Sequence, residues 1–134
     1  LCPCGHTRHN SSYVALLMLY TKNKNLTDTS TQTIVTVPDG HVAYWNLVFV
    51  ANLHNATNSI TLFVDKPSPT PDVYIYNGTN ISSKENLIID GQAVFVLQPG
   101  DIIKASTGSA GNVEVVVTFD LLPAPTVFNN FNGS

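Results

Sequence analysis

The sequence predicts an all-β protein, a two-sheet antiparallel sandwich of jelly-roll type with extended N- and C-terminal arms. Val, Ile and Thr, which favour strands, account for 37 of the 134 residues, whereas Glu and Lys, which usually cover helix surfaces, account for only seven. Short apolar runs recur between turn signals at the spacing found in sandwiches and barrels. The length suits one domain with a single core. We therefore expect an N-terminal arm over residues 1–12, a sandwich domain over residues 13–122 and a C-terminal arm over residues 123–134.

Nine strands are expected. The first is the apolar block of residues 13–20; its Leu, Ala and Met content favours a helix, but it is short for one and has no amphipathic stripe. The polar residues 21–31 follow, and the alternating residues 32–37 then predict a strand that ends at the Pro38-Asp39-Gly40 turn. The remaining strands are expected over residues 41–52, 59–66, 72–76, 85–89, 92–97, 102–106 and 113–122.

The longest expected strand, residues 41–52, is apolar on both faces. Strict alternation places one set of residues on one face: Ala43, Trp45, Leu47, Phe49 and Ala51. It places the other set on the opposite face: Val42, Tyr44, Asn46, Val48 and Val50. One face belongs to the core, and the other is too apolar for open solvent. We therefore predict that Val42, Tyr44 and Val48 lie at an interface with another subunit.

Turn residues separate the strands in the second half of the chain. Prolines at positions 67, 69 and 71 predict a stiff connection without regular structure. Asn77-Gly78 and Asp90-Gly91 are strong signals for tight hairpin turns, so each is expected to end one strand and begin the next. The Gly- and Ser-rich residues 107–112 form a loop before the last strand.

The low charge excludes some functions and indicates others. Only 11% of the residues are charged and the net charge is −3, without a clustered basic face, so we expect no direct binding to nucleic acid. No run reaches the roughly 18 apolar residues of a membrane span, so we expect no membrane partner. Polarity comes instead from neutral Asn, Thr and Ser. Few charges beside apolar outer strand faces indicate surfaces that other subunits cover.

The sequence offers one candidate metal site and no catalytic motif. Cys2, Cys4, His6 and His9 supply four zinc-type donors, but their spacing does not match two separated ligand pairs, so we expect neither metal nor cofactor. A Cys2–Cys4 disulfide would close a strained ring, which leaves paired and free thiols both open. The chain has no Gly-x-Ser-x-Gly elbow and no His-x-His pair of a cupin-like metalloenzyme. We therefore expect no enzymatic activity.

Several strand and turn motifs occur in an order that resembles a known group of proteins. The motifs are TIVTVPDG (33–40), VFVAN (48–52), ITLFV (60–64), VLQPGDIIKA (96–105) and GNVEV (111–115). This frame spans roughly two thirds of the chain and resembles small β-sandwich virion proteins of tailed bacteriophages. These are capsid decoration (cement) proteins and the related neck, tail or fibre modules. The resemblance implies a non-enzymatic structural protein that binds and stabilises a phage head lattice.

The resemblance also implies partners and a location. The partners would be the major capsid protein or other virion proteins together with further copies of this chain, with a homotrimer favoured, on the capsid surface. We expect the C-terminal arm to reach a neighbouring subunit through Val127, Phe128 and Phe131. The alternative is a neck, tail or fibre module that binds host glycans through exposed loops such as residues 67–71 or 107–112.

Overall fold

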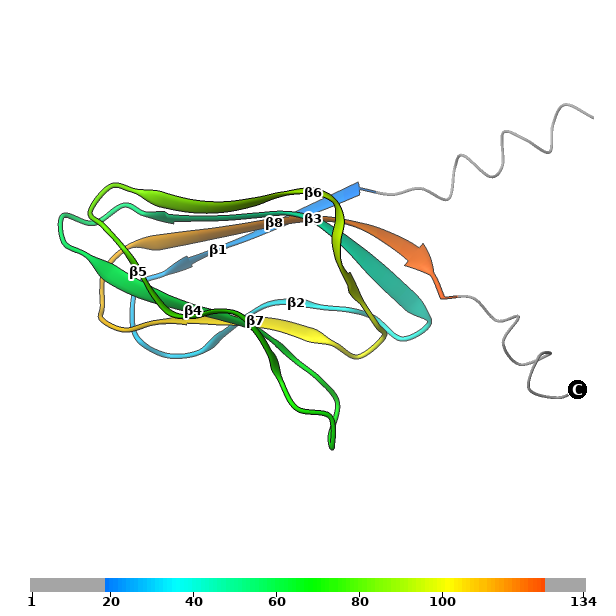
Figure 1. The fold of residues 1–134 in the computed structure, drawn as a ribbon. Helices are drawn as coiled ribbons and strands as arrows, with labels where there is room; N and C mark the ends of the chain where they lie inside the picture. Colours follow the sequence, from blue (N-terminus) through cyan, green and yellow to red (C-terminus); the bar gives the residue numbers. More distant parts are fainter. Residues whose placement is uncertain (1–18, 125–134) are drawn as a thin grey trace, which may run out of the picture.

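The computed structural model describes residues 19–124, apart from the side chains of residues 92–94. It contains eight strands packed in two layers (Figure 1). The strands are β1 (Leu19–Leu26), β2 (Gln32–Thr36), β3 (His41–Asn52), β4 (Asn58–Asp65), β5 (Val73–Ile81), β6 (Asn86–Leu97), β7 (Ile102–Thr107) and β8 (Val113–Pro123). The start of β1 and the end of β8 lie at the same end of the sandwich (Figure 1).

The two sheets have the strand orders β1-β8-β3-β6 and β2-β7-β4-β5, and every neighbouring pair is antiparallel. Successive strands alternate between the sheets except at β4 and β5, which are neighbours in one sheet. This eight-stranded arrangement is that of a jelly roll. The prediction of a two-sheet antiparallel sandwich of this type is confirmed, whereas the two expected arms fall almost wholly outside the described residues.

The core lies between the sheets and follows from alternation within the strands. Val113, Val115 and Val117 of β8 are fully buried, and so are Ile60 and Leu62 of β4 in the other sheet. Alternate residues of the same strands keep partial exposure because successive side chains point to opposite sides of a sheet.

Strand β3 departs from simple alternation because it contains a bulge. Its pairing with β8 shifts between Trp45 and Leu47, so Asn46 is an extra residue relative to β8 and the following residues change faces. The pairing with β6 shifts at the same point, where residues 91–94 of β6 stand against Asn46. Val48 is 1% exposed in the core, whereas Leu47 and Phe49 lie on the outer face. The predicted face assignment is correct as far as Trp45 and wrong after it.

The first described strand includes residues that the sequence pattern does not predict as strand. β1 covers Leu19–Leu26, so the polar residues 21–26 form an edge strand paired with β8. Leu26 alone among its residues is fully buried, which explains why apolar periodicity does not reveal the strand. The first part of the expected strand, residues 13–18, lies outside the described residues.

Neither of the two predicted hairpin turns is present. Asn77-Gly78 lies inside β5, where the pairing with β4 shifts between Ile60 and Leu62, and Gly78 adopts a positive φ of 64°. Asp90-Gly91 lies inside β6, whose pairing with β3 shifts at the same point as the β3 bulge. Residues that suit a positive φ also suit bulges, so these dipeptides bend long strands instead of ending them.

Candidate functional site

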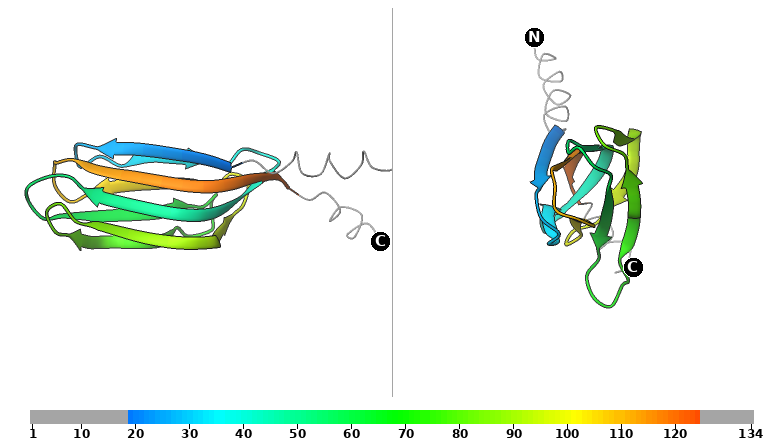
Figure 2. Two further views of the ribbon diagram at one scale, coloured as in Figure 1. Left: turned by 90° about the horizontal axis from the view of Figure 1, so that it is seen from above. Right: turned by 90° about the vertical axis from the view of Figure 1, so that its left-hand side faces the viewer.

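The β1-β8-β3-β6 sheet lies toward the viewer in the left view of Figure 2. Its register places a group of apolar residues on its outer face. We call this group the outer patch. The sheet register builds it: Phe49 of β3 lies opposite Val116 of β8 and Ile88 of β6. Beyond the bulge, Tyr44 lies opposite Val96. The outer patch consists of Tyr44, Leu47, Phe49, Ile88, Val96 and Val116.

The outer patch is accessible in the isolated chain. Ile88 is 56% exposed and Val96 is 47% exposed, while Phe49 and Val116 are half-buried. Isolated exposed apolar residues are ordinary on protein surfaces, but a contiguous group across three strands marks an interaction surface. The group exists because the Asn46 bulge turns Leu47 and Phe49 outward.

The polar residues around the outer patch have one sign of charge. Asp90, Glu114 and Asp120 lie on the same outer face, beside neutral Thr and Asn side chains. Asn23 Nδ2 donates to Glu114 Oε2 at 3.3 Å, and Asn46 Nδ2 donates to Asp120 Oδ2 at 3.4 Å. Within residues 19–124 this face carries no Lys or Arg, since Lys22 and Lys24 alternate to the other side of β1. An apolar centre with a polar rim is the usual anatomy of a protein interface.

The outer face of the other sheet is different, because its charges pair with each other. Lys104 Nζ and Asp65 Oδ2 form an ion pair at 2.6 Å, and the Phe63 and Tyr74 rings stack with centroids 5.2 Å apart. The hydrogen bond from Lys104 lowers the pKa of Asp65 from its ordinary value of 3.8. The contact therefore stabilises the fold at pH values above 3.8, the ordinary pKa of the group. This stabilisation is lost as the pH falls through the lower pKa of Asp65 in the folded state.

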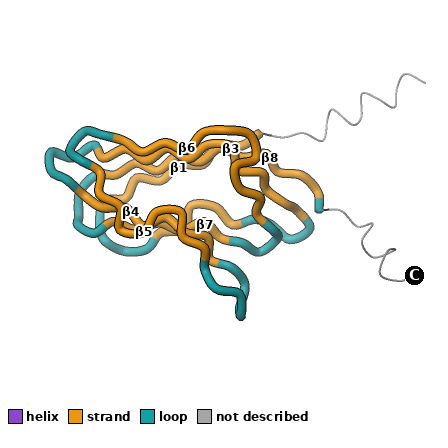
Figure 3. Tube along the Cα trace, in the orientation of Figure 1, coloured by secondary structure: helices purple, strands orange, loops and turns teal. Residues whose placement is uncertain are grey.

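Several loops lie at one end of the sandwich (Figure 3). Buried polar side chains hold these loops in place. Asn52 is fully buried, and its Nδ2 donates to the carbonyls of Ala56 and Ile81, which joins two loops. Asn58 Nδ2 donates to the Ser109 carbonyl at 2.8 Å, and its Oδ1 accepts from the Ser109 backbone N–H at 3.0 Å. These bonds make the loop end a rigid part of the scaffold.

Three of the residues predicted to form the interface lie within the described part of the chain, and of these three Tyr44 alone belongs to the outer patch. Val42 is 6% exposed and is thus already buried within the chain. Val48 is a core residue, so its assignment to an interface is wrong, and the bulge at Asn46 is the reason. Val127, Phe128 and Phe131 lie outside the described residues, as do all four candidate metal ligands, Cys2, Cys4, His6 and His9.

The sequence pattern does not identify Leu47, Phe49 and Ile88 as surface residues. The available signal was that residues 41–52 are apolar on both faces, which correctly indicates a covered outer surface but gives no information on the bulge. Among residues 19–124 no three His, Cys, Asp or Glu side chains are close enough to hold a metal ion together. The same residues include no helix of the length and apolarity needed to cross a membrane.

Comparison with known proteins finds likeness in structure alone. No protein-family model matches the chain, and no curated protein matches it in sequence. A chain in the acid-stable capsid of Helicobacter pylori bacteriophage KHP30 is similar in structure, with a TM-score of 0.52 and 12% identity over 80% of this chain and 90% of that one. At this identity the likeness shows a shared fold.

Two weaker structural likenesses extend over a similar length. The tobacco streak virus coat protein has a TM-score of 0.40 and 8% identity over 83% of this chain and 88% of that chain. The Drosophila NLP core has a TM-score of 0.42 and 12% identity over 78% of this chain and 97% of that chain.

Proposed function

We propose that this chain is a virion structural protein, a capsid decoration protein that docks through its outer patch. The observation that carries the proposal is the patch itself: six apolar residues on three strands, surrounded by neutral and acidic side chains. Such a surface binds another protein and offers no group for covalent chemistry.

The fold supports the same role. Jelly rolls are a common architecture of viral capsid proteins, although lectins and cupins share it. The structural likeness to the chain in the phage KHP30 capsid covers 80% of this chain and 90% of that one. A chain of similar fold and comparable length is therefore present in a phage capsid. A bacteriophage particle is therefore the context that we propose for this chain.

The charges around the outer patch favour a different protein over a second copy as its occupant. A two-fold contact between two outer patches would bring Asp90, Glu114 and Asp120 of each copy together. Juxtaposed like charges oppose association. A capsid protein surface with an apolar centre and Lys or Arg at its rim would complement both the patch and its charges, and we propose the major capsid protein as this partner.

Replacing Ile88 and Val96 together with serine should weaken binding to the virus particle by roughly tenfold to hundredfold, because both side chains would lose apolar burial at the interface. The test is co-sedimentation of the purified chain with particles that lack it. Leu53→Ser with Val73→Ser is the matched control, since these residues are 44% and 51% exposed and neither belongs to the outer patch.

The control pair should bind like the unaltered chain, and both pairs should unfold at a similar urea concentration. Binding should also weaken as salt is raised, and Asp90→Asn with Asp120→Asn should reduce this salt dependence. Equal binding by the two serine pairs would contradict the outer patch as the docking surface.

A further inference from the structure

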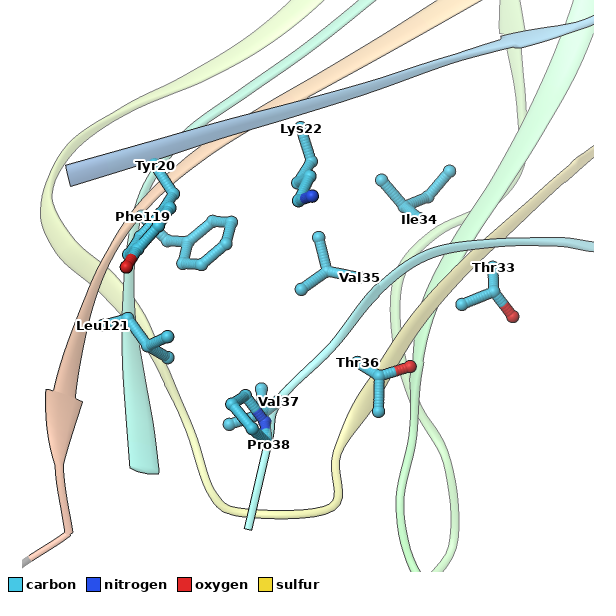
Figure 4. Close-up of a pocket in the computed structure, with 10 residues that line it drawn as sticks. All are labelled: Tyr20, Lys22, Thr33, Ile34, Val35, Thr36, Val37, Pro38, Phe119 and Leu121. Atoms are coloured by element: carbon cyan, nitrogen blue, oxygen red, sulfur yellow. The ribbon is translucent and has the colours of Figure 1, made fainter. Parts of the chain in front are cut away.

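A second apolar feature lies on the open side of the sandwich, between β1 and β2 (Figure 4). It is a cleft of about 400 Å³ with a floor that includes Val35, Phe119 and Leu121. The Tyr20 ring stacks on Phe119 with centroids 5.6 Å apart at one side. Lys22, Thr33 and Thr36 form the polar lip. We call this feature the edge cleft.

The topology leaves the edge cleft open. β1 and β2 are the terminal strands of their sheets, each paired on one side alone, and no described strand closes the space between them. The cavity on the opposite side, between β5 and β6, is much smaller at about 120 Å³. The edge cleft is therefore the larger apolar hollow between the two sheets in the described part of the chain.

The two strand edges beside the edge cleft are poor templates for an added strand. β2 has a register shift between Thr33 and Val35, and β1 carries two exposed lysines. Bulges and edge lysines both discourage edge-to-edge pairing. An occupant of the edge cleft is thus held by side chains inserted into it.

The chain carries a segment suited to this role directly after β8. Residues 125–134 include Val127, Phe128 and Phe131 and have no charged side chain. Two phenylalanines spaced three residues apart offer separate aromatic groups to a cleft that is itself lined by Tyr20 and Phe119. Fully extended, ten residues reach about 33 Å, which is far enough to contact a neighbouring molecule.

The course of the chain favours insertion into a second copy. The Ala124 backbone N–H donates to the Gly40 carbonyl at 2.7 Å, so the chain is fixed at the end of the sandwich where it leaves β8. Prolines at positions 123 and 125 flank this point, and proline favours extended continuation over a return toward the chain's own edge cleft.

We propose that Phe128 and Phe131 of one copy insert into the edge cleft of a second copy and so join the chains into a homo-oligomer. This contact uses a different surface from the outer patch, and it does not depend on the proposed virion role. The purified chain alone is sufficient to test it.

The test compares the association of full-length variants by sedimentation velocity. Phe128→Ser with Phe131→Ser removes the donor side chains, and Thr36→Trp fills the edge cleft from an exposed position on its lip. Each should weaken self-association by about a hundredfold, as expected for the loss of two buried aromatic side chains. Asn129→Ser with Asn130→Ser and Thr57→Trp are the matched controls and should associate like the unaltered chain.

Mixing two variants shows whether the C-terminal segment enters the cleft of its own chain or that of a second copy. We call Phe128→Ser with Phe131→Ser the donor variant and Thr36→Trp the cleft variant. The donor variant retains an open cleft and the cleft variant retains both phenylalanines, so the mixture should form a heterodimer that neither variant forms alone. All variants should keep the urea midpoint of the unaltered chain. The proposal would be overturned if the unaltered chain were monomeric, or if the donor and cleft variants associated normally. It would also be overturned if mixing these two variants gave no heterodimer. The proposal would also be overturned if Leu16→Ser with Leu17→Ser dissociated the oligomer while the donor variant did not. The N-terminal segment would then be the occupant of the edge cleft.

Discussion

Replacing Trp45 with alanine should destabilise the fold by about 3–5 kcal/mol, the usual cost of removing a buried tryptophan. Trp45 is fully buried on β3, directly before the bulge, and its ring centroid lies 5.3 Å from that of Phe95. The cavity would open between the two sheets at the point where β3 changes faces. The measurement is the urea midpoint and slope of equilibrium unfolding.

Trp45→Phe is the matched control and should cost much less. It preserves an aromatic contact with Phe95, and it removes Nε1, a buried donor without a hydrogen-bond partner in the described structure. An unpaired buried polar group costs about 1–3 kcal/mol, so its removal offsets part of the lost packing. A loss below about 1 kcal/mol for Trp45→Ala would contradict the central place of this residue in the core.

Lys66→Met should destabilise the fold by about 3 kcal/mol, at the low end for breaking a buried ion pair because Lys66 keeps some solvent exposure. Lys66 Nζ lies 2.7 Å from Asp101 Oδ2, which also accepts a hydrogen bond from the Gln98 backbone N–H at 2.8 Å. Asp101 is fully buried, so the substitution leaves a carboxylate without its compensating charge. Thermal or urea unfolding of the purified variant measures the loss.

Two further variants separate charge burial from simple loss of a lysine. Lys104→Met removes the partner of Asp65 in a pair with both side chains more exposed to solvent, so it should cost much less stability than Lys66→Met. Lys66→Met combined with Asp101→Asn removes both charges of the buried pair and should recover much of the stability lost in Lys66→Met. Equal losses for Lys66→Met and Lys104→Met would contradict the role assigned to burial.

Composition and periodicity predict the fold class because they report on many residues at once. The abundance of β-branched residues and the alternation in residues 60–64 and 113–121 indicate two sheets around one core. β1 escapes prediction because an edge strand buries little, and Leu26 is its one fully buried side chain. Local chemistry at Asn77-Gly78 and Asp90-Gly91 suits a bulge as well as a turn, and strand pairing decides between them.

The candidate docking surface was predictable in kind and not in detail. The apolar character of both faces of residues 41–52 indicates a covered outer surface. Which residues form the outer patch depends on one extra residue, Asn46. Because of this bulge, Val48 points into the core, and Leu47 and Phe49 lie on the outer face. The edge cleft depends on which strands end the two sheets, and no local pattern in the sequence determines that order.

Cryo-electron microscopy of the intact virus particle tests the proposed docking role most directly. We expect the chain to appear on the capsid shell, with the outer face of β1-β8-β3-β6 against the major capsid protein and basic residues of that protein near Asp90, Glu114 or Asp120. A chain absent from the particle, or bound with this face turned to solvent, would contradict the proposal.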